Sequence, residues 1–240
     1  MADKKRQIIA IGGGGFYRDP ENLALERYII QQTDTTAPRV AFVPTASAEP
    51  DSYLVSFYTA FLKLGCRPSH LSFFKRTPDL RTFLLNQNVI FVGGGNTKSM
   101  LAVWREWGLD HHLRTAWEAG VVLGGASAGS ICWFEHGLTD SVAGPLTAMP
   151  CLGFLAGANC PHYDSEAARR PTLRRLVACG ALPGALAADD GVALHFVGDR
   201  LARIVSSRPR AKAYRVRKSR NRAVETRLPT KFLGARTRKK

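Results

Sequence analysis

Short apolar runs alternate with amphipathic stretches through the first half of the chain. The runs are four or five residues long, are apolar on both faces, and are followed by polar or glycine-rich loops; they cover 7–11, 39–43, 70–74, 89–92 and 121–124. Between them, apolar residues recur at helical spacing over 22–32, 52–64, 79–86, 99–107 and 109–119. This alternation predicts an α/β fold: a mainly parallel sheet with helices on both faces.

The pattern changes after residue 134. Glycines and prolines make 135–152 loop-like, 155–159 reads as a strand, and 166–178 reads as a basic helix. Two strands are expected at 185–188 and 192–197, followed by a closing C-terminal antiparallel strand pair at 201–205 and 212–216. We therefore expect one α/β domain over 1–216 and a basic, poorly ordered tail over 217–240.

The formal net charge of +15 is concentrated at the C-terminus. Residues 208–240 hold 14 Lys or Arg and one acid, Glu225, whereas the rest of the chain has 20 basic and 18 acidic residues. Such a segment is able to contact nucleic acid or another anionic surface. Since the charges beyond residue 217 are accompanied by a single aromatic residue, Phe232, we favour a solvated extension.

Several classes of protein are disfavoured by composition. No run of about 18 apolar residues predicts a membrane span, and the first apolar run is too short for a signal peptide. The five cysteines are scattered, so we expect a reducing cytoplasm, and no His, Asp or Glu spacing indicates a metal. Gly12–Gly15 lack the pattern of a dinucleotide loop, so we expect no cofactor and interpret them as allowing close approach to the active-site turn at Ser127.

The segment Gly125-Ala126-Ser127-Ala128-Gly129 follows an apolar strand and has the G-x-S-x-G pattern of a nucleophile elbow. In such a turn the serine hydroxyl is exposed between a strand and a helix, and backbone N–H groups at the helix start form part of an oxyanion hole. The alternative is a glycine-rich turn with an incidental serine. The preceding strand favours the catalytic interpretation.

A serine nucleophile needs a base, and the base needs an orienting acid. Of the six histidines, His162 is the favoured base because it lies in a polar loop after a strand. His70 and His195 lie in apolar strand patterns typical of core histidines. Asp189 and Asp190, in a turn between two strands, are the candidate acids, and Asp140 and Asp164 are less well placed.

Four motifs together resemble the peptidase E (aspartyl dipeptidase) and cyanophycinase family, whose fold is similar to that of class I glutamine amidotransferases. They run in the family's order over about residues 8–216: Val92-Gly93-Gly94-Gly95-Asn96-Thr97, the Ser127 elbow, Cys160-Pro161-His162-Tyr163 and Asp190-Gly191-Val192-Ala193-Leu194. The resemblance implies a serine peptidase that acts on short peptides without a cofactor.

The resemblance also implies a role for individual residues. Ser127 corresponds to the nucleophile, His162 to the base and Asp190 to the third member, where the family often has glutamate; Asp189 is the alternative. Gly94, Gly95 and Ala128 correspond to the oxyanion hole, and Asn96, Arg169 and Arg170 to substrate-binding positions, the arginines holding the carboxylate of an N-terminal aspartate. Two alternatives stay open: a cyanophycinase-like hydrolase of β-aspartyl-arginine, and a non-enzymatic module that uses its basic tail on nucleic acid.

Overall fold

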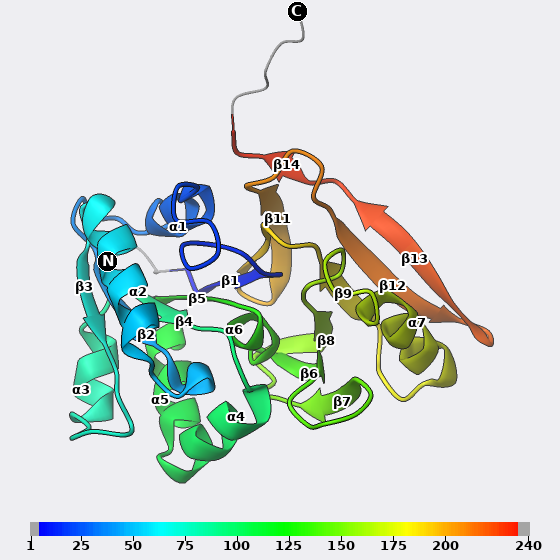
Figure 1. Ribbon diagram of the computed structural model, residues 1–240, viewed down its shortest axis with the longest axis horizontal. Helices are drawn as coiled ribbons and strands as arrows, with labels where there is room; N and C mark the ends of the chain where they lie inside the picture. The colour runs from blue at the N-terminus through cyan, green and yellow to red at the C-terminus, as the bar shows by residue number, and fades with distance from the viewer. Residues whose placement is uncertain (1–4, 235–240) are drawn as a thin grey trace, which may run out of the picture.

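The apolar runs of the first half form the centre of a large sheet. The computed structural model describes residues 5–234, and its first sheet has eight strands in the order β14-β11-β10-β1-β5-β4-β2-β3 (Figure 1). The strands are β1 Gln7–Ile11, β2 Arg39–Val43, β3 Arg67–His70, β4 Val89–Val92, β5 Val122–Ala126, β10 Val192–Val197, β11 Arg200–Ser206 and β14 Lys231–Phe232. The five from β1 to β5 pair in parallel, and β10 pairs antiparallel with β1 and β11.

Helices cover both faces of this sheet, as the sequence predicts (Figure 1). The helices on one face are α1 Ala24–Ile30 and α2 Asp51–Lys63, and those on the other are α3 Leu80–Leu85, α4 Thr97–Glu106 and α5 Leu109–Glu118. Successive residues of one strand serve opposite faces: Phe42 packs with α1 and α2, whereas Ala41 and Val43 pack with α4 and α5. Burial on both faces explains why β1, β2, β4 and β5 are largely apolar. The edge strand β3, at Arg67–His70, is polar and lies three residues before the run expected at 70–74.

The second half of the chain builds a six-stranded mixed sheet that the sequence did not reveal. Its order is β13-β12-β9-β8-β6-β7, and α7 Arg169–Cys179 packs against it. Its strands are β6 Phe134–Thr139, β7 Thr147–Pro150, β8 Leu155–Cys160, β9 Ala185–Ala188, β12 Ala213–Ser219 and β13 Arg222–Leu228. The segment 135–152 is thus a β-hairpin rather than a loop.

Two expectations for the C-terminal region are wrong. The strands expected at 201–205 and 212–216 exist but do not pair with each other: β11 joins the large sheet, whereas β12 pairs with β9 and β13. The tail expected to be poorly ordered from 217 is folded to residue 234, because β12 extends to Ser219 and β13 and β14 follow. Residues 235–240 lie outside the described residues. Within 5–234, no helix combines the length and hydropathy needed to cross a bilayer.

Candidate active site

Ser127 lies on a strained turn between β5 and the short helix α6, Ala128–Ile131. Its φ of 58° and ψ of −113° place a non-glycine residue in a region of the backbone map that costs energy. The turn is packed so closely that a Cβ on Gly129 would lie 2.2 Å from the carbonyl oxygen of Val92. Only glycine therefore fits at position 129 of this turn.

His162 lies beside Ser127 in space although it is 35 residues away in sequence. It follows β8, and its backbone N–H donates to the carbonyl of Gly12 at 3.0 Å. With a φ of 55° it has the second strained backbone of the site. Its Nε2 lies 2.9 Å from Ser127 Oγ.

Asp190 completes a chain of hydrogen bonds from the carboxylate to the serine. Its Oδ1 lies 2.7 Å from His162 Nδ1, and its backbone N–H donates to Asp164 Oδ1 at 2.8 Å. Burial acts to raise the pKa of Asp190, but the hydrogen bond and charge of His162 outweigh it and hold the pKa below its ordinary value. An ionised carboxylate only accepts hydrogen bonds, so His162 Nδ1 carries the hydrogen and Nε2 accepts from the Ser127 hydroxyl.

The neighbouring Asp189 is directed elsewhere. Its Oδ2 accepts a hydrogen bond from the backbone N–H of Lys212 at 2.8 Å, and its side chain is buried. Burial raises the pKa of Asp189 to about 6. Of the two acids that the sequence left open, only Asp190 reaches the imidazole.

The glycine loop after β1 lies directly behind this group. A Cβ on Gly13 would lie 2.0 Å from Asp190 Oδ1 and 2.5 Å from His162 Nδ1. The glycine loop thus makes a close approach, but to two other segments, those of His162 and of Asp190, rather than to the Ser127 turn expected from the sequence.

A cavity of about 240 Å³ opens in front of Ser127 and His162. Besides these two, its lining comes from loops at the carboxyl ends of the parallel strands and from α2: Gly13, Gly14, Tyr17, Arg18, Ser47, Pro50, Tyr53, Gly94, Gly95 and Ala126. Arg18 is the one cationic lining residue, and no carboxylate among residues 5–234 lies within ion-pair distance of it. Binding at the carboxyl ends of strands is the rule for parallel sheets.

The chain matches a known protein family over most of its length. The sequence model described as peptidase family S51 matches residues 8–204. The chain belongs to peptidase family S51. It is 54% identical over 230 residues to the uncharacterized peptidase YgaJ of Bacillus subtilis, a match that covers 95% of this chain and 100% of that protein.

Solved structures share the fold of this S51 chain at low sequence identity. A peptidase from an acI-B1 actinobacterium superposes with a TM-score of 0.74 and 17% identity, over 95% of this chain and 96% of that one. A putative peptidase E protein from Listeria monocytogenes superposes with a TM-score of 0.61 and 18% identity, over 94% and 100%. The resemblance to the peptidase E family is confirmed.

Three residues expected to bind substrate in this S51 chain do not line the cavity. The guanidinium of Arg169 is buried, with hydrogen bonds to Glu166 and to the carbonyl of Leu138 at 2.6 Å each and an ion pair to Asp140 at 3.6 Å. It therefore joins α7 to the strand β6. The structure gives no support to a role in substrate binding.

Arg170 and Asn96 are also engaged elsewhere. Arg170 forms an ion pair with Glu225 and lies over the rings of Tyr163 and Tyr214. Asn96 is the N-cap of α4: its side-chain oxygen accepts from the N–H of Ser99 at 2.9 Å, and its amide nitrogen donates to the carbonyl of Ser141 at 3.0 Å. The cationic lining residue, Arg18, was missed because a lone arginine in a polar loop has no sequence signal.

The histidines expected in strands have structural partners. The two ring nitrogens of His195 pair with the Tyr28 hydroxyl at 2.7 Å and with Gln7 Oε1 at 3.0 Å. Burial, aided by the charge of Arg203, lowers the pKa of His195 to about 4, so it is a neutral core residue. His70 pairs with the hydroxyl of Tyr58 at 2.9 Å.

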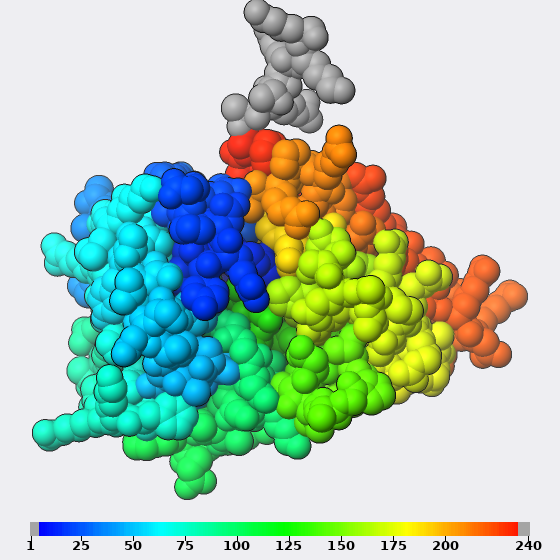
Figure 2. Space-filling view, in the orientation of Figure 1, coloured from blue at the N-terminus to red at the C-terminus, as the bar shows by residue number. Residues whose placement is uncertain are grey.

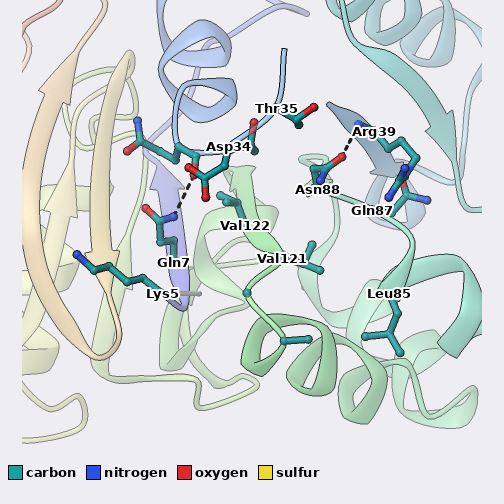
Figure 3. Close-up of a pocket in the computed structure, with 14 residues that line it drawn as sticks. Lys5, Gln7, Asp34, Thr35, Arg39, Leu85, Gln87, Asn88, Val121 and Val122 are labelled. Carbon is teal, nitrogen blue, oxygen red and sulfur yellow. Dashed lines mark hydrogen bonds between the residues drawn. The ribbon is translucent and has the colours of Figure 1, made fainter. Parts of the chain in front are cut away.

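A second cavity, of about 330 Å³, lies at the opposite edge of the sheet. Figure 3 shows its lining at the amino ends of the strands, where Gln7 donates to the carbonyl of Gln32 and Asn88 accepts from the N–H of Arg39. The lining includes neither serine nor histidine. Among the described residues, no group of three or more His, Cys, Asp or Glu is arranged to hold a metal ion.

A buried acid supports the loop that carries Arg18. Glu26 on α1 is fully buried; its Oε1 accepts the N–H of Phe16 at 2.8 Å, and its Oε2 has no hydrogen-bond partner among the described residues. Burial is the main cause that raises the pKa of Glu26 from 4.5 to about 7. Folding therefore favours the protonated form of Glu26.

This shift makes the free energy of unfolding depend on pH. The contribution of Glu26 is most favourable below pH 4.5, declines as pH rises to about 7, and is constant above; the total loss is about 3 kcal/mol. In Glu26→Gln this decline should disappear. Urea unfolding at pH 5 and pH 8 measures most of it: the wild type should lose about 2–3 kcal/mol more between the two pH values than the variant. Equal losses in both proteins would contradict the assignment.

Proposed function

We propose that this S51 peptidase is a serine peptidase that hydrolyses short peptides through Ser127, His162 and Asp190. The observation that carries the proposal is the pair of distances on the two sides of one imidazole, 2.9 Å to the serine hydroxyl and 2.7 Å to the carboxylate. Both contacts are already short enough for proton transfer. A non-enzymatic module would have no need of this aligned geometry or of two strained backbones.

The reaction follows from these contacts. His162 takes the proton of Ser127 as the hydroxyl attacks the peptide carbonyl, and Asp190 stabilises the imidazolium that forms. The oxyanion accepts hydrogen bonds from backbone N–H groups; we assign these to Ala128 and to the Gly94–Gly95 loop, which lines the cavity beside Ser127. His162 then gives the proton to the leaving amine, and water attacks the acyl-enzyme by the same steps.

We further propose that the substrate is a dipeptide with an N-terminal aspartate, whose carboxylate is held by Arg18. A cavity of about 240 Å³ suits a ligand of this size. Its lining includes one cation and, among the described residues, no Asp or Glu. A β-aspartyl-arginine substrate would place a cation in a cavity that offers no carboxylate, so the cyanophycinase-like alternative is disfavoured.

We also propose a cytoplasmic location. The five cysteines form no disulfide, which supports it.

A dipeptide panel tests the proposal. Release of free amine from Asp-Leu, Asn-Leu and β-Asp-Arg is measured with wild type and Arg18→Gln. A hydrogen-bonded charge contributes about 1.5–3 kcal/mol, so kcat/KM of the variant for Asp-Leu should fall about 10- to 150-fold. Its kcat/KM for Asn-Leu, which has no carboxylate side chain, should change less than about 3-fold.

Arg170→Gln is the matched control, because it removes one arginine outside the cavity. We expect its preference for Asp-Leu over Asn-Leu to equal that of the wild type. If Arg170→Gln loses this preference and Arg18→Gln keeps it, the assignment of Arg18 is wrong. If none of the dipeptides is hydrolysed by wild type, the substrate class is wrong.

A further inference from the structure

The C-terminal hairpin carries a group of exposed cations. β12 and β13 pair over their whole length, from Ala213 opposite Leu228 to Ser219 opposite Arg222. The exposed cations of the hairpin are Arg217, Lys218, Arg220, Arg222 and Arg227. None of them lies within 4.0 Å of a carboxylate in the described part of the chain. The charge is therefore available to a partner.

Helix α7 extends this positive surface. The helix packs against both strands of the hairpin, and its exposed side includes Arg174 and Arg175. Arg174 from the helix and Arg222 from the hairpin lie on the two sides of an open groove of about 720 Å³. We call these seven residues the basic hairpin surface: Arg174, Arg175, Arg217, Lys218, Arg220, Arg222 and Arg227.

The acid of the hairpin does not neutralise this surface. Glu225 accepts a hydrogen bond from the hydroxyl of Tyr163 at 2.5 Å and forms an ion pair with Arg170. Its side chain is only 12% exposed. Seven exposed cations of α7 and the hairpin thus face solvent with no carboxylate of residues 5–234 within 4.0 Å, which favours a dense polyanion as the ligand.

The shape of the surface favours double-stranded DNA. The hairpin projects from the body at the right-hand edge of Figure 1, and its orange residues project in the same way in Figure 2. A two-stranded ribbon fits the major groove of B-form DNA, whereas the major groove of A-form RNA is too narrow. Strands of seven residues span about 23 Å, the length of about seven base pairs.

The hairpin lacks the groups that other anionic partners require. Its single aromatic residue, Tyr214, is covered by the guanidinium of Arg170 at 5.1 Å from the ring centre, so no platform for stacked single-stranded bases exists there. The large exposed hydrophobic residue in the hairpin is Val224, and a single valine is a weak anchor in a membrane surface. We propose that the basic hairpin surface binds the phosphate backbone of double-stranded DNA without reading its sequence.

The salt dependence of binding tests this proposal. Binding of a fluorescein-labelled 24-base-pair DNA duplex is followed by anisotropy between 50 and 300 mM KCl. Wild type should bind with a slope of log K against log salt of about −4 to −6, because each neutralised phosphate contributes about −0.9. The variant Arg217→Gln/Arg220→Gln/Arg222→Gln should bind about 10-fold or more weakly at 100 mM KCl, with a slope that is smaller by about 3.

A charge-matched variant tests whether DNA binding depends on the basic hairpin surface or only on the positive charge of the whole protein. Lys75→Gln/Arg76→Gln/Arg81→Gln also removes three exposed cations, beside α3 on the opposite side of the molecule (Figure 1). It should bind the duplex like wild type. All substituted side chains are exposed, so both variants should melt within a few degrees of wild type.

Four results would overturn the proposal. They are no binding of the duplex by wild type, equal losses in the two triple variants, tighter binding of the single strand than of the duplex, and hairpin-dependent binding of phosphatidylserine vesicles without binding of DNA. The cavity at Ser127 contains no residue of the basic hairpin surface, so the test does not depend on the peptidase reaction.

Discussion

Replacement of Ser127 by alanine should lower kcat for peptide hydrolysis about 10⁴-fold or more while the fold is kept. The hydroxyl is the nucleophile of the proposed reaction, and the histidine and aspartate have no function without it. The backbone conformation of residue 127 is no more strained for alanine than for serine. The measurement is single-substrate kinetics on a hydrolysed dipeptide, together with thermal melting of both proteins.

Ser130→Ala is the matched control, because Ser130 lies one turn further along α6. Its Oγ donates to Asn159 Oδ1 at 3.0 Å in the core and does not line the cavity. Loss of this buried hydrogen bond should cost about 1–2 kcal/mol of unfolding free energy but leave kcat within a few-fold. A Ser127→Ala protein that hydrolyses peptides at the wild-type rate would remove the basis of the serine mechanism.

The second large effect is expected at the carboxylate. Asp190→Asn should lower kcat about 10³- to 10⁴-fold, because an amide is able to donate to Nδ1 and so favours the tautomer that carries its hydrogen on Nε2. That tautomer is unable to accept the serine proton. Kinetics on the same dipeptide give the result.

Asp189→Asn makes the same chemical change one residue earlier. The carboxylate of Asp189 bonds the N–H of Lys212 and not the imidazole, so this variant should keep kcat within about 5-fold. The two substitutions thus decide which acid belongs to the triad. A greater loss in Asp189→Asn than in Asp190→Asn would reverse the assignment.

The central sheet and the place of Ser127 at its edge follow from local sequence. Strands buried on both faces leave continuous apolar runs, and a parallel sheet brings the segments after those runs to one edge. Of the three residues only Ser127 follows such a strand. His162 and Asp190 follow β8 and β9 of the second sheet, so their place beside Ser127 was implied by the family resemblance and not by the strand pattern. Asp190 was not separable from Asp189, because which of two adjacent carboxylates faces a partner depends on the exact path of the turn.

The second sheet was missed because its edge does not have a buried face. In β13, only Ala223, Glu225 and Leu228 are partly covered, whereas Val224, Thr226 and Arg227 are exposed, so the sequence has no continuous apolar face and resembles a solvated segment. Arg169 was misjudged for the opposite reason. A buried arginine needs carboxylate and carbonyl partners, and those on β6 and beside it lie about 30 residues earlier in the chain, where no local pattern reveals them.

The close packing of Gly13 against His162 and Asp190 limits which substitutions the sequence of this enzyme tolerates. Gly13 has no reactive atom, yet a single methyl group there would occupy the volume in which imidazole and carboxylate meet. A survey that weighs only residues with reactive groups would overlook this position. As long as descendants of this chain keep the same three reacting side chains, the bare backbone at residue 13 has to be inherited with them.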